Sequence, residues 1–467
     1  MDMHEDDGSI NITPLINRFE QMLKQKDEWY FDVQEFEVIS DFYFETARPA
    51  KAMKAAELAS RQHPYCISFV ARKAQVFTFT NELKKAQKQI QRLAEMDPEG
   101  LEHRLAQAAY HSKKEEHQEA IDCYQKALRI ASFPEEIWPV LAMEYQIMGR
   151  YKMACKYLRR TLSENPRDEL ASYNIALCFD FLDQSEEGIR YFTQFTDQHP
   201  YSEIAWYHMG ILYAKERDYE NALKAIDYAI LIDEFFTAAY YEKARVLERT
   251  YRYKEASEIY KASIENEGPT GYSYYKIGIC HLKQHKPDKA LIYFTKAIQE
   301  DSDMDEAYYE LALLKDENQA GPESVYFINK ALELCPENAN YLYIAAEIHR
   351  RAGMLNEAEL LYTKLIELGH IDPDIFIDYA ELLFDLCEFD EGMEVLYQGV
   401  QLNPDSAEIN YRLSGYLYTL QEEDEASIYF KKALKLDPDR RLFFFQLFPK
   451  LKHAPAVSEL SRKYVSR

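Results

Sequence analysis

Glycine and proline are both scarce in this sequence, which has 14 Gly and 17 Pro among 467 residues. Turn-rich all-β folds, collagen and low-complexity chains need many more of these residues, so the composition excludes them. The length also excludes one compact core, because single cores stop growing at roughly 250–300 residues. We therefore expect several domains or an extended array of repeats.

Positive charge is in deficit, with 55 Lys and Arg against 80 Asp and Glu, which gives a formal net charge of −25. Nucleic-acid binding needs clustered Lys and Arg to neutralise phosphates. We therefore expect no nucleic-acid partner.

Signals for export or membrane insertion are also missing. Residues 1–12 are acidic where a secretory signal would be basic and then apolar, so we expect a disordered acidic lead. No apolar run approaches the roughly 18 residues of a membrane span. Seven dispersed cysteines without a C-x-x-C motif favour a reducing compartment. We expect a cytoplasmic protein, and we interpret the acidic, tyrosine-rich composition as bacterial.

Small residues recur every 34 residues in two series that lie twelve residues apart. The first series is Ser40, Ala74, Ala108, Ala142, Ala176, Gly210, Ala244, Gly278, Ala312, Ala346, Ala380 and Ser414. The second series is Ala52, Ala86, Ala120, Ala154, Gly188, Ala222, Ala256, Ala290, Ser324, Ala358, Gly392 and Ala426. No insertion or deletion breaks this phase from Val33 to Arg440, so the sequence predicts twelve consecutive repeats of 34 residues.

The spacing inside each repeat is that of helices. Ile226 follows the small residue Ala222 by four positions, and Ala229 comes three positions later. Small, large and small residues at i, i+4 and i+7 form one face of a helix that packs closely on another helix. Proline closes seven of the repeats, where it can end one helix and start the next. Each repeat is therefore predicted to be two helices of roughly 12–14 residues with short turns.

The stretch from Ala205 to Asp233, AWYHMGILYAKERDYENALKAIDYAILID, resembles the tetratricopeptide repeat. The framework residues that carry the resemblance are Trp206, Met209, Gly210, Tyr213, Ala222, Ile226 and Ala229. The same framework recurs in all twelve repeats. The resemblance implies an all-α fold, a right-handed α-solenoid superhelix of antiparallel helix pairs with capping helices at its ends.

The expected domain organisation follows the phase of the repeats. Residues 13–32 are predicted to form an N-terminal capping helix, and residues 441–467 a degenerate C-terminal repeat or cap. The twelve repeats between them span residues 33–66, 67–100, 101–134, 135–168, 169–202, 203–236, 237–270, 271–304, 305–338, 339–372, 373–406 and 407–440.

The C-terminal segment is basic, with six basic residues against Glu459. Capping is the simpler interpretation. The alternative is that this segment is an aromatic, basic surface helix that touches a membrane or an acidic partner.

Motifs for catalysis or cofactor binding are absent from the sequence. It has neither G-x-G-x-x-G nor a P-loop ending in Gly-Lys-Ser/Thr. His281 and His285 have the i, i+4 spacing of two metal ligands, but no Glu lies beside His281 and no third ligand is evident. His281 also falls on an inward framework position, so we interpret it as a packed residue. We predict a protein that is not an enzyme and has no cofactor or metal site.

The resemblance also implies where a partner binds. In tetratricopeptide proteins the first helix of each repeat lines a concave groove through positions 2, 5, 9, 12 and 13. Carried onto this sequence, position 5 forms a ladder of tyrosines at Tyr173, Tyr207, Tyr241, Tyr275, Tyr309, Tyr343 and Tyr411. Tyrosine at this position either contacts a partner or packs on the adjacent helix, and the sequence leaves both alternatives open.

Other groove positions contribute apolar and basic side chains, mostly in the middle of the array. These candidate partner-binding residues are Phe181, Ile211, Lys215, Arg245, Arg249, Ile279, Lys283, Arg350 and Arg351. An apolar and mildly basic groove in an acidic protein favours a partner segment with acidic and apolar residues. We therefore predict a protein-interaction scaffold or adaptor that binds a protein or peptide segment.

Two other functions remain open at this stage. A regulatory repeat protein that senses a small peptide would use the same groove. An RNA-binding helical repeat also stacks helix pairs, but its repeats are typically one residue longer and such proteins are usually basic, which disfavours it.

Overall fold

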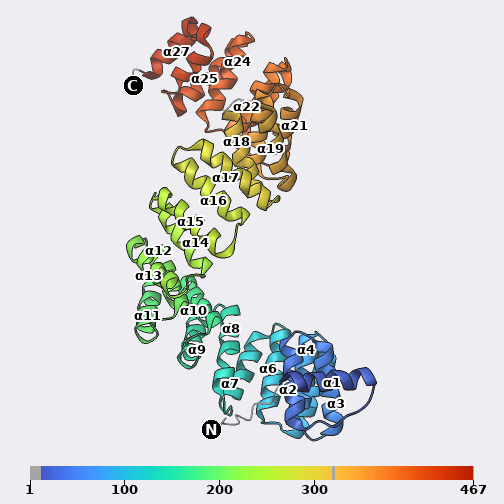
Figure 1. Ribbon diagram of the computed structural model, residues 1–467. Coiled ribbons are helices and arrows are strands. Elements are labelled where there is room, and N and C mark those ends of the chain that lie inside the picture. Colours follow the sequence, from blue (N-terminus) through green and yellow to red (C-terminus); the bar gives the residue numbers. More distant parts are fainter. Residues whose placement is uncertain (1–11, 318–320, 466–467) are drawn as a thin grey trace. The chain divides into compact units, whose positions relative to one another are not determined.

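The fold is an all-α solenoid of paired helices, as the sequence predicts, in the computed structural model (Figure 1). The structure describes residues 12–317 and 321–465, and this part of the chain contains no β-strand. The predicted acidic lead lies outside the described residues, except for Ile12, which begins the first helix. Contacts divide the chain into an N-terminal body, Met1–Glu242, and a C-terminal body, Lys243–Arg467. Each body is described by itself.

The N-terminal body consists of one helix followed by helix pairs. Its helices are α1 (Ile12–Gln25), α2 (Val33–Glu45), α3 (Pro49–Gln62), α4 (Ile67–Phe79), α5 (Leu83–Met96), α6 (Leu101–Lys113), α7 (His117–Leu128), the short 3₁₀ helix η1 (Pro134–Glu136), α8 (Trp138–Ile147), α9 (Tyr151–Glu164), α10 (Glu169–Phe181), α11 (Ser185–Gln198), α12 (Glu203–Lys215) and α13 (Tyr219–Ile232).

The C-terminal body continues the same pattern, and its boundary with the N-terminal body falls inside α14. Its helices are α14 (Thr237–Arg249), α15 (Tyr253–Glu267), α16 (Gly271–Lys283), α17 (Pro287–Glu300), α18 (Asp305–Glu317), α19 (Gly321–Leu334), α20 (Ala339–Arg351), α21 (Leu355–Glu367), α22 (Pro373–Asp385), α23 (Phe389–Leu402), α24 (Ala407–Thr419), α25 (Glu423–Leu436), α26 (Arg441–Leu447), the 3₁₀ helix η2 (Pro449–His453) and α27 (Pro455–Val465).

Each helix pair is held together where a small residue of its first helix meets a large residue of its second. A Cβ atom on Gly278 of α16 would lie only 2.5 Å from Phe294 Cε1 of α17, and one on Gly210 of α12 would lie 2.5 Å from Ile226 Cγ1 of α13. Both large side chains are fully buried. The predicted small and large positions therefore mark the places where two helices come closest.

In the eleven repeats whose turn the structure describes, the turn between the two helices has the same backbone conformation at the same position. One residue, the fifteenth of its repeat, has a left-handed φ between 52° and 78°. These residues are Ala47, Asn81, Glu115, Gly149, Asp183, Arg217, Tyr251, His285, Gly353, Cys387 and Gln421. Beside one of them, Arg252 N donates to Leu247 O at 2.9 Å, which closes the end of α14 in the manner of a Schellman cap. The turn is thus fixed by helix capping and not by glycine alone.

Repeat 4 departs from regular geometry. Its first helix, α8, begins at Trp138, and the residues before it form η1. Pro134 and Pro139 cause this, because proline lacks the N–H that a helix interior needs and is tolerated only in a first turn. Pro139 also stands at the fifth position of the repeat, where later repeats have tyrosine.

Both ends of the chain pack on the neighbouring repeat. In the N-terminal body, α1 buries Phe19 against Phe36 of the first repeat, with ring centroids 6.5 Å apart. In the C-terminal body, Phe444 of α26 is 2% exposed and lies 4.9 Å from Phe430 of α25. The first helix of this last segment is short because Pro449 follows, and the residue before a proline is kept out of the helical region.

Removing a large residue from one helix pair tests this packing. Phe294→Ala leaves a cavity opposite Gly278 and should lower the free energy of unfolding by about 3–5 kcal/mol. Denaturant titration followed by circular dichroism measures the loss. Gln299→Ala, at an exposed position of the same helix, is the control and should change stability by less than about 0.5 kcal/mol. Equal effects of the two substitutions would contradict this account.

Candidate functional site

Exposed apolar side chains gather on the first helices of repeats 4 and 5 in the N-terminal body. Met143 and Ile147 of α8 are 60% and 52% exposed, and Leu170, Tyr173 and Phe181 of α10 are 69%, 50% and 63% exposed. The two helices are neighbours, because Gln146 Nε2 of α8 lies 3.4 Å from the carbonyl oxygen of Asn174 of α10. We call these five residues the apolar first-helix patch.

Two members of this patch, Met143 and Ile147, were not predicted from the sequence, whereas Leu170 falls on groove position 2 of its repeat. They precede Leu177 and Phe181 by one repeat length, so they occupy the same two groove positions. The 34-residue spacing alone was enough to assign Met143 and Ile147 to groove positions. These two positions were overlooked because this repeat has Pro139, and not tyrosine, at the ladder position.

The predicted tyrosines of the N-terminal body stay partly exposed. The Tyr173 ring contacts His208 of the next first helix, with centroids 5.9 Å apart, and remains half exposed. Tyr207 is half-buried and lies 5.1 Å from Phe236. Tyr241, on α14, is also half-buried. Tyr173 therefore joins two neighbouring repeats, Tyr207 packs on the end of its own repeat, and all three tyrosines keep part of the side chain accessible.

In the C-terminal body the tyrosines of the ladder are engaged in packing. Tyr343 Oη donates to Asp378 Oδ2 at 2.5 Å, and Tyr411 Oη donates to the carbonyl oxygen of Asp437 at 2.8 Å. Tyr309 stacks on Tyr341 of the next first helix at 4.9 Å. Tyr275 contacts Phe294 of its own repeat at 5.8 Å. Burial raises the pKa of all four hydroxyls above the ordinary value. In this half of the ladder, the tyrosines therefore pack on neighbouring residues of the chain.

Three of the predicted basic groove residues have acidic neighbours. Lys215 Nζ lies 2.7 Å from Asp180 Oδ1, and this carboxylate raises the pKa of the lysine. In the C-terminal body, Arg350 lies 3.3 Å from Asp385, and Arg351 lies 2.9 Å from Asp316. These ion pairs join the first helices of adjacent repeats. The basic spot predicted in the tenth repeat is therefore offset by carboxylates.

The other predicted groove residues lie on three first helices. Ile211 is half-buried on α12 of the N-terminal body. In the C-terminal body, Arg245 and Arg249 are exposed on α14, Lys283 is exposed on α16, and Ile279 is half-buried on that same helix. Arg249 and Lys283 are one repeat length apart, so they hold equivalent places on successive helices.

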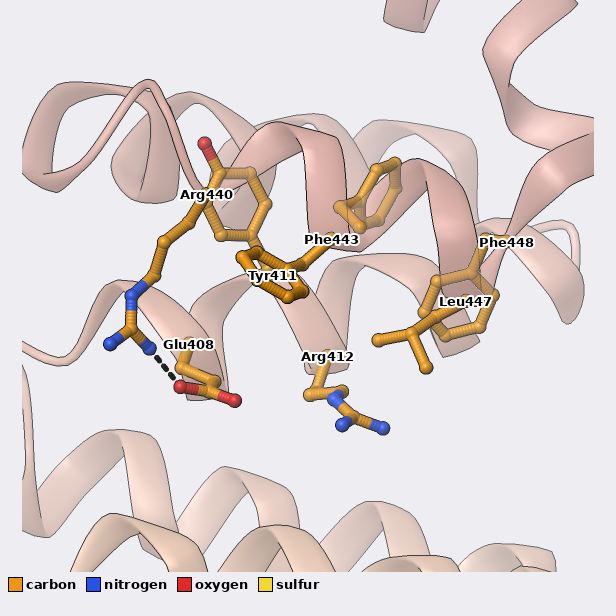
Figure 2. A pocket seen from close by; sticks show the side chains of 8 residues that line it. Glu408, Tyr411, Arg412, Arg440, Phe443, Leu447 and Phe448 are labelled. Carbon is orange, nitrogen blue, oxygen red and sulfur yellow. Dashed lines mark hydrogen bonds and ion pairs between the residues drawn. The ribbon is translucent and has the colours of Figure 1, made fainter.

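A pocket of about 210 Å³ lies between α24 and the C-terminal segment (Figure 2). Figure 2 shows aromatic and leucine side chains on one side and two arginines at the rim. Arg440 is paired with Glu408, and Arg412 with Glu381 outside the view. The residues that line the pocket are Glu408, Tyr411, Arg412, Arg440, Phe443, Phe444, Leu447 and Phe448. The pocket lies where Tyr411, the last tyrosine of the ladder, packs beside the terminal cap.

The two histidines with metal-ligand spacing do not come together. His281 is buried and stacks on Tyr293 with centroids 5.3 Å apart, which confirms that it is a packed residue. His285 is the exposed left-handed residue of the following turn. Within residues 12–317 and 321–465, no group of three His, Cys, Asp or Glu side chains is placed to hold a metal ion. The same residues include no helix long and apolar enough to cross a membrane.

Comparison with known proteins assigns the repeats to a family. Models of the tetratricopeptide repeat match residues 136–168, 271–304 and 407–440, residues 72–134, and residues 170–202. A TPR repeat-containing protein of Methanocaldococcus jannaschii is 24% identical over 330 residues, which cover 65% of this chain and 58% of that protein. The peroxisomal targeting signal receptor of Komagataella phaffii is 25% identical over 215 residues, covering 44% of this chain and 35% of the receptor.

Solved structures include similar repeat proteins. The crystal structure of YrrB, described as a TPR protein with an unusual peptide-binding site, is 21% identical, with a TM-score of 0.33. The alignment covers 38% of this chain and 92% of YrrB. In contrast, this chain spans less than two thirds of the length of the two sequence relatives named above.

The paired helices, the 34-residue period and the repeat matches define an α-solenoid built from tetratricopeptide repeats. The chain belongs to the tetratricopeptide repeat family.

The histidine that supports Tyr173 should make stability depend on pH. Burial lowers the pKa of His208 from 6.5 to about 4. The unfolded chain therefore binds a proton between these two values that the folded chain does not, and stability falls as the pH falls through this window. The full effect is about 3 kcal/mol.

Thermal unfolding of the wild type and of His208→Phe, measured from neutral pH down to pH 4, tests this expectation. The variant should lose part of the acid destabilisation, whereas His285→Gln, at an exposed histidine, should keep all of it. An identical pH dependence in wild type and His208→Phe would show that His208 does not titrate in this way.

Proposed function

We propose that this protein is a non-catalytic scaffold that holds an apolar segment of a partner protein on the apolar first-helix patch of its N-terminal body. The observation that carries the proposal is the exposure of Met143, Ile147, Leu170, Tyr173 and Phe181 on two neighbouring helices. Large apolar side chains of a soluble protein rarely gather in this way unless another molecule covers them.

The side chains of the patch are suited to contact large apolar side chains of a partner. Tyr173 and Phe181 offer rigid aromatic faces, and Phe181 is already oriented by stacking on Tyr151 at 4.8 Å. Met143 can adapt its shape to an incoming side chain because its thioether chain is flexible. Rigid aromatic residues beside an adaptable one suit two or three large apolar side chains of a partner segment.

The comparisons support a protein partner in general terms. Tetratricopeptide relatives include a receptor whose name states that it recognises a peroxisomal targeting signal, and a solved repeat protein is described as having a peptide-binding site. For this chain, a peptide segment as the bound element is our proposal.

A phage-displayed library of random peptides is a suitable probe for the patch. We expect the wild type to enrich peptides with two or more large apolar residues, and the double variant Met143→Asp/Leu170→Asp to bind the enriched peptides at least about tenfold more weakly. Both residues are exposed, so the substitutions should leave the fold intact. Leu231→Asp is the control, because Leu231 is 78% exposed on α13 and lies outside the patch. Equal binding by all three proteins would exclude the patch as the site.

We propose in addition that acidic groups of a partner bind the first-helix face of the C-terminal body. Arg249 and Lys283 are exposed there at equivalent places of successive repeats. Both side chains are exposed to water, so their contacts with acidic groups contribute little to affinity. We therefore expect these contacts to act mainly on the association rate.

Charge reversal tests this second contact. The double variant Arg249→Glu/Lys283→Glu should weaken binding of an acidic, apolar peptide and remove most of the salt dependence of its association rate, measured by surface plasmon resonance. The control Lys254→Glu reverses one charge on α15, a second helix. An unchanged salt dependence in the double variant would contradict the proposal.

A further inference from the structure

Two cysteines meet where the fourth and fifth repeats of the N-terminal body pack together. Cys155 lies on α9 and Cys178 on α10, and both belong to the same buried apolar cluster. Their side chains share a hydrogen bond, and both are free thiols. Gln146 Nε2 of α8 also donates to Cys178 Sγ, at 3.4 Å. We call the two cysteines the Cys155–Cys178 dithiol.

The helix faces around the dithiol are in contact along more than one turn. Arg159 follows Cys155 by four residues, so it lies on the same face of α9. Its Cζ lies 5.6 Å from the ring centroid of Phe179, the residue after Cys178. The contact between the two thiols is therefore part of a continuous interface between α9 and α10.

The repeat pattern distinguishes this junction from the others. Cys155 is the twenty-first residue of its repeat, and Cys178 is the tenth residue of the next one. At the other junctions between consecutive repeats, these two positions never both hold cysteine. The equivalent residues one such junction of the C-terminal body carries are Ser257 and Cys280, both buried. The packing of the repeat therefore does not require a pair of thiols.

A surface pocket of about 410 Å³ leads to the dithiol. Its lining residues are Lys152, Cys155, Lys156, Arg159, Phe179, Leu182, Gln184 and Glu187. Cys155 is 6% exposed and Cys178 is fully buried. A molecule of the size of water or hydrogen peroxide can therefore approach the pair from the side of Cys155.

Hydrogen bonding makes the two sulfur atoms chemically different. Donation from Cys155, and in addition from Gln146, lowers the pKa of Cys178, although burial opposes this effect. The pKa of Cys155 is raised, because its hydrogen bond to Cys178 and its burial both oppose ionisation. Cys178 is thus the sulfur that ionises more easily, and Cys155 is the thiol beside it. A thiolate next to a second thiol is the usual arrangement of a redox-sensitive cysteine pair.

We propose that the Cys155–Cys178 dithiol is a redox site, which hydrogen peroxide oxidises to a disulfide that joins repeat 4 to repeat 5. The Cys178 thiolate attacks one peroxide oxygen, the O–O bond breaks, and Cys178 becomes a sulfenic acid while the other oxygen leaves as water after taking up a proton. The Cys155 sulfur then attacks the Cys178 sulfur, and the hydroxyl group leaves as water with the Cys155 proton. The two thiols lose two electrons, which reduce the peroxide to water.

A thiol reductant reverses the reaction by exchange, so the bond is a reversible modification. The proposal does not depend on what the apolar first-helix patch binds.

Oxidation of the reduced, full-length chain with hydrogen peroxide tests the site. The remaining thiols are alkylated under denaturing conditions, and the digested protein is analysed by mass spectrometry. We expect the peptides that contain Cys155 and Cys178 to be linked, with the loss of two hydrogens, and to separate again in dithiothreitol. Cys280 is the internal control and should stay unlinked. Recovery of Cys155 and Cys178 as alkylated thiols, at a peroxide dose that oxidises the exposed Cys387, would overturn the proposal.

Denaturant unfolding tests whether the bond joins the two repeats. The oxidised wild type should have a higher unfolding midpoint than the reduced wild type, because the link restricts the unfolded chain. Cys155→Ser copies the serine found at Ser257, so it should fold, and peroxide should not raise its midpoint. Cys387→Ser removes an exposed thiol and should keep the full gain. An oxidised wild type with an unchanged midpoint, or an equal gain in Cys155→Ser, would overturn the proposal.

Discussion

The close approach of two helices at a small residue is the constraint on which the rest of this structure depends. At Gly278 and Gly210 the neighbouring side chain lies where a Cβ atom would have to be. Each pair can therefore exist only with a small residue on one helix and a large one on the other. Because this requirement returns every 34 residues, the framework is set separately in each repeat, and stability accumulates through contacts between neighbours.

The framework uses one face of each helix and leaves the opposite face unconstrained. First helices expose the apolar first-helix patch in the N-terminal body, and second helices expose Ile292, Tyr326 and Leu360 in the C-terminal body. Neither surface takes part in the small-to-large contact that holds a pair together. A change of residue at Leu170 or Leu360 can therefore leave the fold intact.

Most of the fold could be predicted from the sequence, because the helix-pair contact depends on residue size at fixed spacing. Ala222, Ile226 and Ala229 are enough to indicate such a face, and the all-α solenoid confirms it. The late start of α8 could also have been anticipated from Pro134 and Pro139. The division of the chain into two bodies inside α14 has no signal in the sequence, since the repeat phase runs through it unbroken.

The candidate site was harder to predict, because the state of a side chain depends on partners about 35 residues away. Lys215 and Arg351 are basic in the sequence, yet each lies beside a carboxylate of an adjacent first helix. Tyr343 and Tyr173 share a repeat position, yet one donates to Asp378 and the other stays half exposed. Side-chain identity at one position cannot distinguish these cases, since the neighbour on the next helix decides between packing and exposure.

The left-handed turns have a consequence for engineering. Nine of the eleven described turn residues, Tyr251 and Arg217 among them, carry a side chain in a conformation that costs an L-residue roughly 1–2 kcal/mol. Glycine at such a place would relieve that strain at the expense of a more flexible unfolded chain. Each turn belongs to a different repeat, so small gains at separate turns should add. The array therefore contains a set of spaced positions at which its thermal tolerance can be adjusted in steps, repeat by repeat, while both exposed surfaces remain as they are.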